Sequence, residues 1–367
     1  MLLCLPDELP AGLARALAGT QVVGPVPAVG AEPVIAALSP DVPVREVEAG
    51  VLVLSSGSTG KPKVVALSTE AVLASAAATH ARLGGAGNWV CALPTHHVAG
   101  LMTVARAVAG GRTAQFAASD LSDLPSATGR SYLSVVGAQL HRVAGDPELL
   151  ARLRDYAAVL VGGSAVSPLL LERVREAGVR LVTTYGMAET CGGCVYDGVA
   201  LDGVRVGFAT ERITLGGPMV FSGYRGDPES TAQVLRGDTV LTGDRGRLVD
   251  GLLQVTGRVD DMVISGGVNV DLAQAQRIAE EEFGPPQAGG PVLLAVEDER
   301  WGRRIVTVTL GSLTLKGLTE RLRERLGPAA LPKELRRVAA LAYTPTGKID
   351  RRALERAWQE GFDGDGC

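Results

Sequence analysis

Short apolar runs alternate with helix-like segments through the first half of this 367-residue chain. Each run has the length of a buried strand. The runs lie at residues 51–54, 90–93, 132–136, 157–161 and 179–184. Helical patterns fill the intervals, most clearly at 69–83, after the N-cap candidate Ser68, and at 168–177. This alternation predicts an α/β sheet with several parallel strands, and ligand sites in such sheets lie at the carboxyl ends of the strands.

The pattern changes after about residue 210, where short apolar runs are separated by Gly and Asp turns and predict a β-rich subdomain. Beyond Asp260 the sequence predicts a compact α+β unit with a helix at 272–283. We therefore expect a large N-terminal domain over residues 1–259, built from α/β and β-rich subdomains. A hinge at Asp260 would then lead to a small, mobile C-terminal domain over residues 261–367.

Composition narrows the class of protein. The net charge of −4 argues against a general nucleic-acid or membrane-surface binder, and no apolar run approaches the ~20 residues of a membrane span. No signal peptide is recognisable. The five cysteines are odd in number and irregularly spaced, which favours a reducing cytoplasm. Cys191 and Cys194 form a CxxC pair without further zinc ligands nearby, so we interpret them as small residues of a tight loop, with a redox pair as the alternative.

A nine-residue segment directly after the first apolar run combines four hydroxyls, two glycines and two lysines. It reads Ser55-Ser56-Gly57-Ser58-Thr59-Gly60-Lys61-Pro62-Lys63. A loop of this kind can direct backbone N–H groups, hydroxyls and ammonium groups toward one anion, and a triphosphate is the obvious guest. The segment is not a Walker A motif, because Pro62 follows Lys61 and Ser55 stands where that motif has its first glycine.

Four further polar clusters follow in order along the chain. They are 184–190 (TYGMAET), 242–246 (TGDRG), 257–261 (GRVDD) and 345–351 (PTGKIDR). Each alone is compatible with an ordinary turn. Together with the segment at 55–63, in this order and at these separations, they resemble the adenylate-forming superfamily of acyl-CoA synthetases, peptide-synthetase adenylation domains and beetle luciferase. The resemblance covers about residues 50–352.

The resemblance implies an AMP-forming acid–thiol ligase. Such enzymes activate a carboxylate with ATP and Mg²⁺ to an acyl-adenylate, and in the ligases the thiol of CoA then displaces AMP. The partners would be small molecules, namely the carboxylate, ATP and CoA, with no nucleic acid and no membrane. The resemblance leaves open whether the protein forms a homodimer.

The resemblance also assigns nucleotide-binding roles. Ser55, Ser56, Gly57, Ser58, Thr59, Gly60 and Lys63 would hold the β- and γ-phosphates. Tyr185 would stack on adenine, within a segment that continues through Gly186, Met187 and Ala188. Gly163, Ser164 and Ala165 would cover the other face and edge of the base. Asp244 would accept hydrogen bonds from both ribose hydroxyls, and Arg258 would add a ribose contact.

The remaining implied roles concern chemistry and motion. Glu189 would bind Mg²⁺, and Lys348 would bridge the substrate carboxylate and the α-phosphate during adenylation. Asp260 would be the hinge about which the small domain rotates between the two steps. The rotation would remove Lys348 from the active site and bring Ser265, Gly266 and Gly267 toward the pantetheine tunnel. His97 would line and gate the acyl pocket. Joint metal ligation by His96 and His97 is disfavoured, because adjacent residues at a strand end are expected to point to opposite sides.

Within the superfamily, the phosphate loop of this chain begins early, at residue 55. This short N-terminal part and the segment 185–206 are similar to 2-succinylbenzoate–CoA ligases of menaquinone biosynthesis. Other small aryl- or acyl-CoA ligases and free-standing adenylation enzymes are the alternatives. A second substrate carboxylate would need a cation in the pocket, and the candidates are Arg106, Arg112, Arg130 and Arg142.

Two departures from the family pattern keep open a further alternative, a degenerate member that binds nucleotide or acyl groups without turnover. Ala188 stands where the family usually has a hydroxyl residue, and we expect a weaker first step as a result. Residues 271–274 (DLAQ) replace the usual Pro- and Glu-containing start of the following helix.

Overall fold

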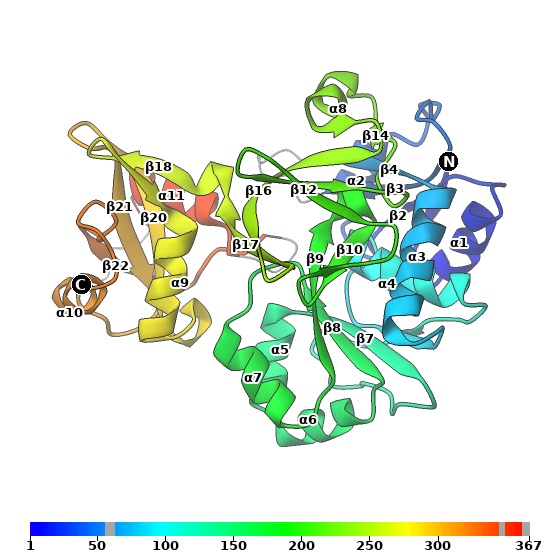
Figure 1. Ribbon diagram of the computed structural model, residues 1–367, viewed down its shortest axis with the longest axis horizontal. Coiled ribbons are helices and arrows are strands. Elements are labelled where there is room, and N and C mark those ends of the chain that lie inside the picture. The colour runs from blue at the N-terminus through cyan, green and yellow to red at the C-terminus, as the bar shows by residue number, and fades with distance from the viewer. Residues whose placement is uncertain (56–62, 345–348, 362–367) are drawn as a thin grey trace. The chain divides into compact units, whose positions relative to one another are not determined.

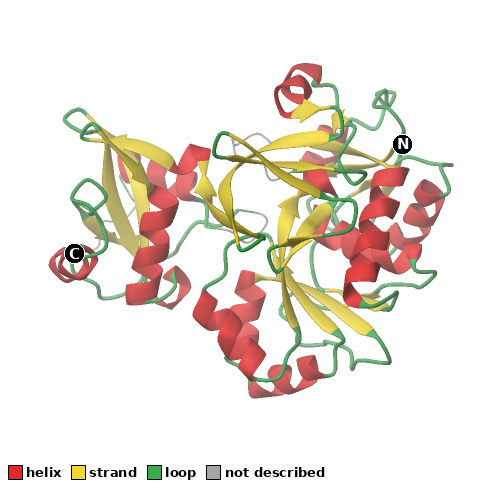
Figure 2. Cartoon of the chain, in the orientation of Figure 1, coloured by secondary structure: helices red, strands yellow, loops and turns green. Residues whose placement is uncertain are grey.

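The computed structural model describes residues 1–55, 63–344 and 349–361 (Figures 1 and 2). Most of the predicted phosphate loop, Lys348 and residues 362–367 lie outside these ranges. The chain divides into two compact units. The first contains residues 1–242 and 248–254, and the second contains residues 243–247 and 255–367.

A seven-stranded sheet forms the centre of the first unit, in the order β11-β10-β9-β8-β7-β5-β6. Its strands are β5 (Asn88–Cys91), β6 (Gln115–Phe116), β7 (Ser131–Val136), β8 (Ala158–Gly162), β9 (Leu181–Met187), β10 (Gly192–Tyr196) and β11 (Val199–Ala200). The five strands from β5 to β9 are parallel, and β10 and β11 join antiparallel. The predicted α/β fold with several parallel strands is confirmed.

Helices cover both faces of this sheet, as the alternation of buried residues along its strands requires. Trp89 of β5 points into a core shared with α3 (Thr69–Leu83) and α4 (Val98–Ala109). Its neighbour Val90 points into a second core. That second core is covered by α5 (Gly137–Ala144), α6 (Pro147–Arg154) and α7 (Pro168–Glu176), which group together in Figure 1. Helix α3 begins as predicted, because the Ser68 hydroxyl accepts a hydrogen bond from the Ala71 N–H at 3.0 Å.

A second sheet of the first unit has five strands in the order β1-β2-β3-β4-β14. Four of them precede the central sheet in the chain, and β14 follows it. Its strands are β1 (Leu2–Cys4), β2 (Val23–Pro25), β3 (Ala49–Leu54), β4 (Val64–Ser68) and β14 (Gly223–Tyr224), and its helices are α1 (Leu9–Leu17) and α2 (Glu32–Leu38). Strands β3 and β4 are antiparallel neighbours. The phosphate-loop segment connects them, and the Ser55 N–H donates to the Lys63 carbonyl at 2.8 Å. The two described ends of this segment are therefore held together.

The β-rich part predicted after residue 210 is confirmed. It contains β12 (Arg205–Ala209), β13 (Arg212–Gly216), β15 (Leu235–Arg236), β16 (Thr239–Val249), β17 (Leu252–Arg258) and the short helix α8 (Pro228–Val234). The sheet has the order β12-β13-β16-β15, and β17 pairs with β16. Strands β16 and β17 contribute residues to both units.

The second unit is a five-stranded sheet with the order β19-β18-β21-β20, to which β22 adds beside β21. Its elements are β18 (Met262–Ser265), β19 (Val268–Asp271), α9 (Leu272–Phe283), β20 (Pro291–Asp298), β21 (Gly302–Thr309), α10 (Leu315–Leu322), β22 (Leu335–Arg337) and α11 (Arg351–Glu360). Alternate residues of β20 enter two cores. Leu293 packs in a core with residues of α9 and α10, and Leu294 packs in a core with residues of α11. The predicted α+β architecture of this part is confirmed.

The predicted hinge residue Asp260 lies in a 3₁₀ turn, η2 (Val259–Asp261), within the second unit. The boundary at Asp260 stays a prediction. No helix in the described part of the chain is both long and apolar enough to cross a membrane.

Candidate active site

The carboxyl ends of the parallel strands gather residues that the sequence singled out. The chain leaves β5 toward His97, leaves β8 through Gly162 to Ser164, and leaves β9 through Met187 to Glu189. Because β5, β7, β8 and β9 are parallel neighbours, these exits lie at one edge of the sheet. The expectation that these polar clusters meet at the carboxyl edge agrees with this topology.

Glu189 lies in a single 3₁₀ turn, η1 (Ala188–Thr190), directly after β9. The Thr190 hydroxyl oxygen accepts from the Met187 N–H at 3.0 Å, and the Glu189 carbonyl accepts from the Phe221 N–H at 2.9 Å. The backbone on both sides of the carboxylate is therefore fixed. The Glu189 Oε1 atom accepts a hydrogen bond from the Tyr224 hydroxyl at 2.7 Å.

This arrangement fits a magnesium ion that is bound mainly by substrate. Among the described residues no group of three or more His, Cys, Asp or Glu side chains could hold a metal. Mg²⁺ in phosphoryl-transfer sites commonly uses one or two protein carboxylates, with phosphates and water completing the octahedron. A single, oriented carboxylate such as Glu189 is suited to that role.

Tyr224 is a residue that sequence reasoning missed. It belongs to β14, a two-residue strand, and no periodicity marks so short an element. Burial, followed by the nearby Glu189 carboxylate, raises the pKa of Tyr224 well above its ordinary value, so that its hydroxyl is protonated and donates.

The predicted adenine-binding segments lie on adjacent strands. Tyr185 is half-buried in β9, opposite Val195 of β10 at a β-bulge. On β8, a side chain at Gly162 would collide with Thr184 of β9, and Gly163 adopts a left-handed φ of +83°. Glycine at these two positions therefore lets the chain turn close to β9. The following residues, Ser164 and Ala165, are exposed at the edge, where a ligand could reach them.

At Gly186 the backbone of β9 lies close to that of β10, and a Cβ atom there would overlap the Gly192 carbonyl. Met187 is half-buried and Ala188 is buried. The backbone from Tyr185 to Ala188 is consequently fixed by pairing and packing. The assignment of these residues to ATP stays a prediction.

His97 immediately precedes α4 and has a largely buried imidazole. Its Nε2 atom is buried without a hydrogen-bond partner in the part of the chain that the structure describes. Burial, together with the neighbouring His96, lowers the pKa of His97 to about 4, so the ring is neutral at pH 7. Gly100 allows α4 to approach the Pro94 carbonyl, where a Cβ would clash, and this fixes the turn that carries His97.

The prediction that His96 and His97 point to opposite sides is wrong. Both residues follow the end of β5 in the turn before α4, where strand alternation no longer applies, and their ring centroids are 4.3 Å apart. The described residues nonetheless supply no third ligand of the His, Cys, Asp or Glu type for a metal.

The CxxC pair is buried. Cys191 is 0% and Cys194 1% exposed, and both belong to the main core of the first unit. Burial raises the pKa of the Cys194 thiol to about 12 and that of Cys191 also well above its ordinary value. Thiols that are rarely ionised are poor nucleophiles, so the geometry favours a structural role over a redox role.

The ribose-binding candidates lie in the second unit. Asp244 accepts from the Arg258 guanidinium at 2.7 Å, and Arg258 also contacts Asp260 at 3.3 Å. The Arg258 guanidinium lies so close to Gly243 that a side chain there would collide with it. The Asp244–Arg258 pair is thus preassembled, and its assignment to the ribose stays a prediction.

The candidate CoA-binding residues form the tight turn between β18 and β19. Gly266 and Gly267 both have left-handed φ angles, and Gly266 packs on the Trp301 ring. Ser265 is 1% exposed, with its Oγ atom lacking a hydrogen-bond partner within the described ranges. After the turn, Asp271 caps α9 by accepting from the Gln274 N–H at 2.9 Å. The departure at 271–274 therefore still provides a helix start.

The four candidate arginines for a second carboxylate do not all face the carboxyl edge. Arg112 donates to Asn88 Oδ1 at 2.9 Å, and Arg130 donates to the Gly84 carbonyl; both contacts are near the amino end of β5. Arg106 is buried in α4, with its guanidinium 5.2 Å from the centroid of the Trp89 ring. The remaining candidates are Arg106, already in contact with Trp89, and Arg142, which is exposed on α5.

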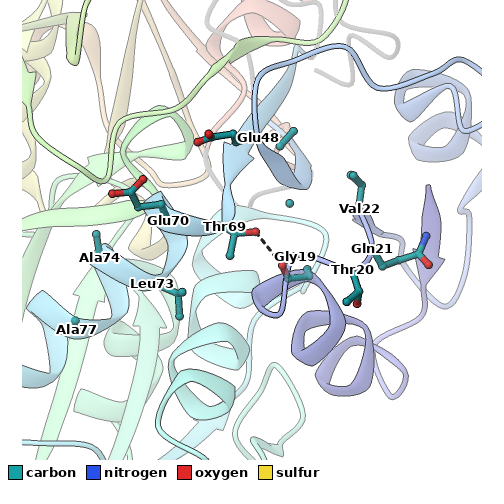
Figure 3. A pocket seen from close by; sticks show the side chains of 13 residues that line it. Gly19, Thr20, Gln21, Val22, Glu48, Thr69, Glu70, Leu73, Ala74 and Ala77 are labelled. Atoms are coloured by element: carbon teal, nitrogen blue, oxygen red, sulfur yellow. Dashed lines mark hydrogen bonds between the residues drawn. The ribbon is translucent and has the colours of Figure 1, made fainter.

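A cavity of about 840 Å³ lies elsewhere in the first unit, along α1, α3 and the start of β3 (Figure 3). Figure 3 shows Glu48 and Glu70 on one side of this groove and Gln21 on the other. The described residues that line it include these two acids and no lysine or arginine. A triphosphate would be repelled there, so the groove does not compete with the sheet edge as a nucleotide site.

Comparison with known proteins identifies the class. A family model, AMP-binding enzyme, matches residues 13–224, and the chain belongs to this family. A probable 2-succinylbenzoate–CoA ligase of Mycobacterium tuberculosis (strain CDC 1551 / Oshkosh) is 38% identical over 327 residues, which cover 84% of this chain and 84% of that protein. The predicted resemblance to adenylate-forming enzymes is confirmed.

Solved structures share the fold. The o-succinylbenzoate CoA synthetase (MenE) of Bacillus subtilis in complex with the acyl-adenylate intermediate OSB-AMP has a TM-score of 0.73 at 23% identity, covering 91% of this chain and 75% of that chain. The same enzyme in complex with ATP and magnesium ion has a TM-score of 0.72 at 20% identity, covering 94% of this chain and 81% of the other.

Proposed function

We propose that this protein is an ATP-dependent ligase that converts 2-succinylbenzoate to its CoA thioester in menaquinone biosynthesis, in the cytoplasm. The observation that carries the proposal is the sheet edge that gathers His97, Ser164, Tyr185 and Glu189 in a member of the AMP-binding enzyme family. The names of the curated relatives supply the substrate. The net charge of −4 and the buried cysteines are compatible with a cytoplasmic enzyme of small molecules.

The reaction has two steps. A carboxylate oxygen of the substrate first attacks the α-phosphorus of ATP, and the bond to the bridging oxygen breaks to release pyrophosphate. The CoA sulfur then attacks the acyl carbonyl of the adenylate, and AMP leaves as the CoA thiol loses its proton. A carboxylate is a weak nucleophile that meets a polyanion, so the protein must align the groups and offset negative charge.

The residues divide this work. Tyr185 and the turn at 163–165 would hold adenine, and Asp244 would hold the ribose. Lys63 and the rest of the loop would hold the β- and γ-phosphates. A magnesium ion bound at Glu189 would neutralise phosphate charge and orient the leaving pyrophosphate.

Two further assignments rest on the family resemblance. Lys348 would donate to the substrate carboxylate and the α-phosphate in the first step. Rotation about Asp260 would then bring Ser265, Gly266 and Gly267 toward CoA. Such alternation lets one site exclude water during adenylation and admit a thiol afterwards.

The neutral His97 ring suits the acyl pocket. A protonated imidazole would hold the substrate carboxylate in an unproductive ion pair, whereas a neutral ring offers an apolar wall with one donor or acceptor nitrogen.

The test is a pair of partial reactions. Pyrophosphate exchange into ATP measures adenylation, and thioester formation from supplied 2-succinylbenzoyl-adenylate and CoA measures the second step. We expect exchange with 2-succinylbenzoate and much less with benzoate or a fatty acid. Exchange only with another carboxylate would replace the substrate, and tight ATP binding without exchange would identify a degenerate binding protein.

Lys348→Ala separates the steps within the same enzyme. We expect exchange to be abolished and thioester formation from the supplied adenylate to be largely retained. Equal loss of both steps would contradict the alternation between two half-reactions.

A further inference from the structure

Residues 221–225 connect the two halves of the predicted phosphate and metal site. The Phe221 N–H donates to the Glu189 carbonyl at 2.9 Å, and the Arg225 N–H donates to the Val64 carbonyl at 2.8 Å. Between these bonds, Tyr224 of β14 pairs with Val65 of β4. This short segment therefore joins the turn that carries Glu189 to the strand by which the chain leaves the phosphate loop.

The Tyr224 side chain contacts a functional candidate on each side. Its hydroxyl donates to Glu189 Oε1 at 2.7 Å. The face of its ring lies 4.5 Å from Lys63 Nζ. One tyrosine thus contacts both the predicted magnesium carboxylate and the predicted phosphate-binding lysine, through two different parts of the side chain.

The surroundings of Tyr224 hold it in this pose. The side chain is 8% exposed, and its ring packs edge-on against Phe221 with centroids 5.0 Å apart. The Tyr224 N–H donates to the Thr231 hydroxyl at 2.9 Å. A buried, fixed donor holds one carboxylate oxygen and leaves the orientation of the carboxylate defined before any ligand arrives.

We propose that Tyr224 is a positioning residue, which orients the Glu189 carboxylate toward magnesium through its hydroxyl and steadies the Lys63 ammonium through its ring. The inference rests on the proposed function only in assigning magnesium to Glu189 and phosphate to Lys63. It is independent of which carboxylate the enzyme activates.

The two contacts predict separable effects. Groups that hydrogen-bond a metal ligand typically change metal affinity about 10- to 100-fold when they are removed. Tyr224→Phe removes the hydroxyl and keeps the ring, so it should weaken only the binding that depends on magnesium. Tyr224→Leu also removes the aromatic face under Lys63, so it should additionally weaken ATP binding without metal.

The experiment measures ATP affinity by calorimetry with excess Mg²⁺ and with EDTA, without any carboxylate substrate. In the wild-type protein Mg²⁺ should increase the affinity. Tyr224→Phe should reduce that increase about tenfold or more, while the affinity in EDTA stays as in the wild type. In a Glu189→Gln background Tyr224→Phe should have no further effect, because the hydroxyl acts through that carboxylate.

Tyr156→Phe is the matched control. The Tyr156 side chain is 2% exposed, and its hydroxyl donates to the Pro125 carbonyl at 2.6 Å, away from the sheet edge. It should lower the melting temperature about as much as Tyr224→Phe and leave the magnesium effect intact.

An unchanged magnesium effect in Tyr224→Phe would overturn the inference, and a melting temperature far below that of Tyr156→Phe would then assign the hydroxyl to stability alone. Full additivity with Glu189→Gln would also overturn it. If the wild-type protein activates a different carboxylate but shows these magnesium effects, the substrate assignment fails and the role of Tyr224 holds. If wild-type ATP binding does not respond to Mg²⁺ at all, both fail.

Discussion

Replacing His97 by glutamine should make the protein less sensitive to acid. In the folded protein the pKa of His97 is about 4, against 6.5 for an ordinary histidine, because burial and then His96 disfavour the charged ring. Between these two values the unfolded chain binds more protons than the folded one, so stability falls as the pH falls from 6.5 toward 4. Well above pH 6.5 the ring is neutral in both states, so His97 no longer lowers the free energy of unfolding.

The magnitude follows from the two pKa values. At pH 5, protonation of His97 in the unfolded chain lowers the free energy of unfolding by about 2 kcal/mol. At pH 7.5 this effect is close to zero. His97→Gln removes the titrating group, so the variant should lose about 2 kcal/mol less than the wild type between these pH values. His96 and His80 also have lowered pKa values, but they are present in both proteins and cancel in the comparison.

Urea unfolding at pH 7.5 and pH 5.0, followed by circular dichroism, gives the four free energies of unfolding. The pH 7.5 pair measures what the substitution costs in packing, and the difference between the two pH-induced losses isolates the proton linkage. If wild type and variant lose the same free energy on acidification, the pKa of His97 is not lowered in the folded protein.

Three other substitutions test the predicted nucleotide-binding residues. Gly162→Ala should lower the melting temperature and weaken ATP binding, because the new methyl group meets the Thr184 side chain and carbonyl; calorimetry and thermal unfolding measure both effects. Ala188→Ser should speed pyrophosphate exchange about five- to thirtyfold, if a hydroxyl at the start of η1 supplies the missing contact of about 1–2 kcal/mol to phosphate; an unchanged rate would show that alanine costs nothing there. Asp244→Asn should weaken AMP binding about tenfold or more, because it removes the charge that would hold the ribose hydroxyls and that pairs with Arg258; equilibrium dialysis with AMP checks this.

Local sequence signals predicted the central fold because they are strong there. The buried parallel strands appear as short, mostly apolar runs, and helix α3 has both its Ser68 cap and its Gly84 stop. Helix α6 was not predicted, although Asp146 caps it and Pro147 begins it. Strand β9 was expected to end at Thr184 but continues to Met187, because pairing with β10 extends it through a polar sequence.

Only those residues of the candidate site that belong to recognisable sequence motifs could be predicted. Glu189, Tyr185 and His97 follow strands directly, so their place at the sheet edge follows from chain order and parallel pairing. Tyr224 has no such signal, because its contacts to Lys63 and Glu189 join segments far apart in sequence. The proximity of the His96 and His97 rings was missed because a turn replaces the strand geometry assumed for them.

Each face of the sheet in the second unit has a core formed by residues of that unit alone. The packing of these cores therefore does not depend on apolar side chains of the first unit. A module of this kind keeps its internal structure in any orientation. Evolution or an engineer can therefore alter the linker, or exchange the module between related enzymes, without redesigning a hydrophobic core in either unit.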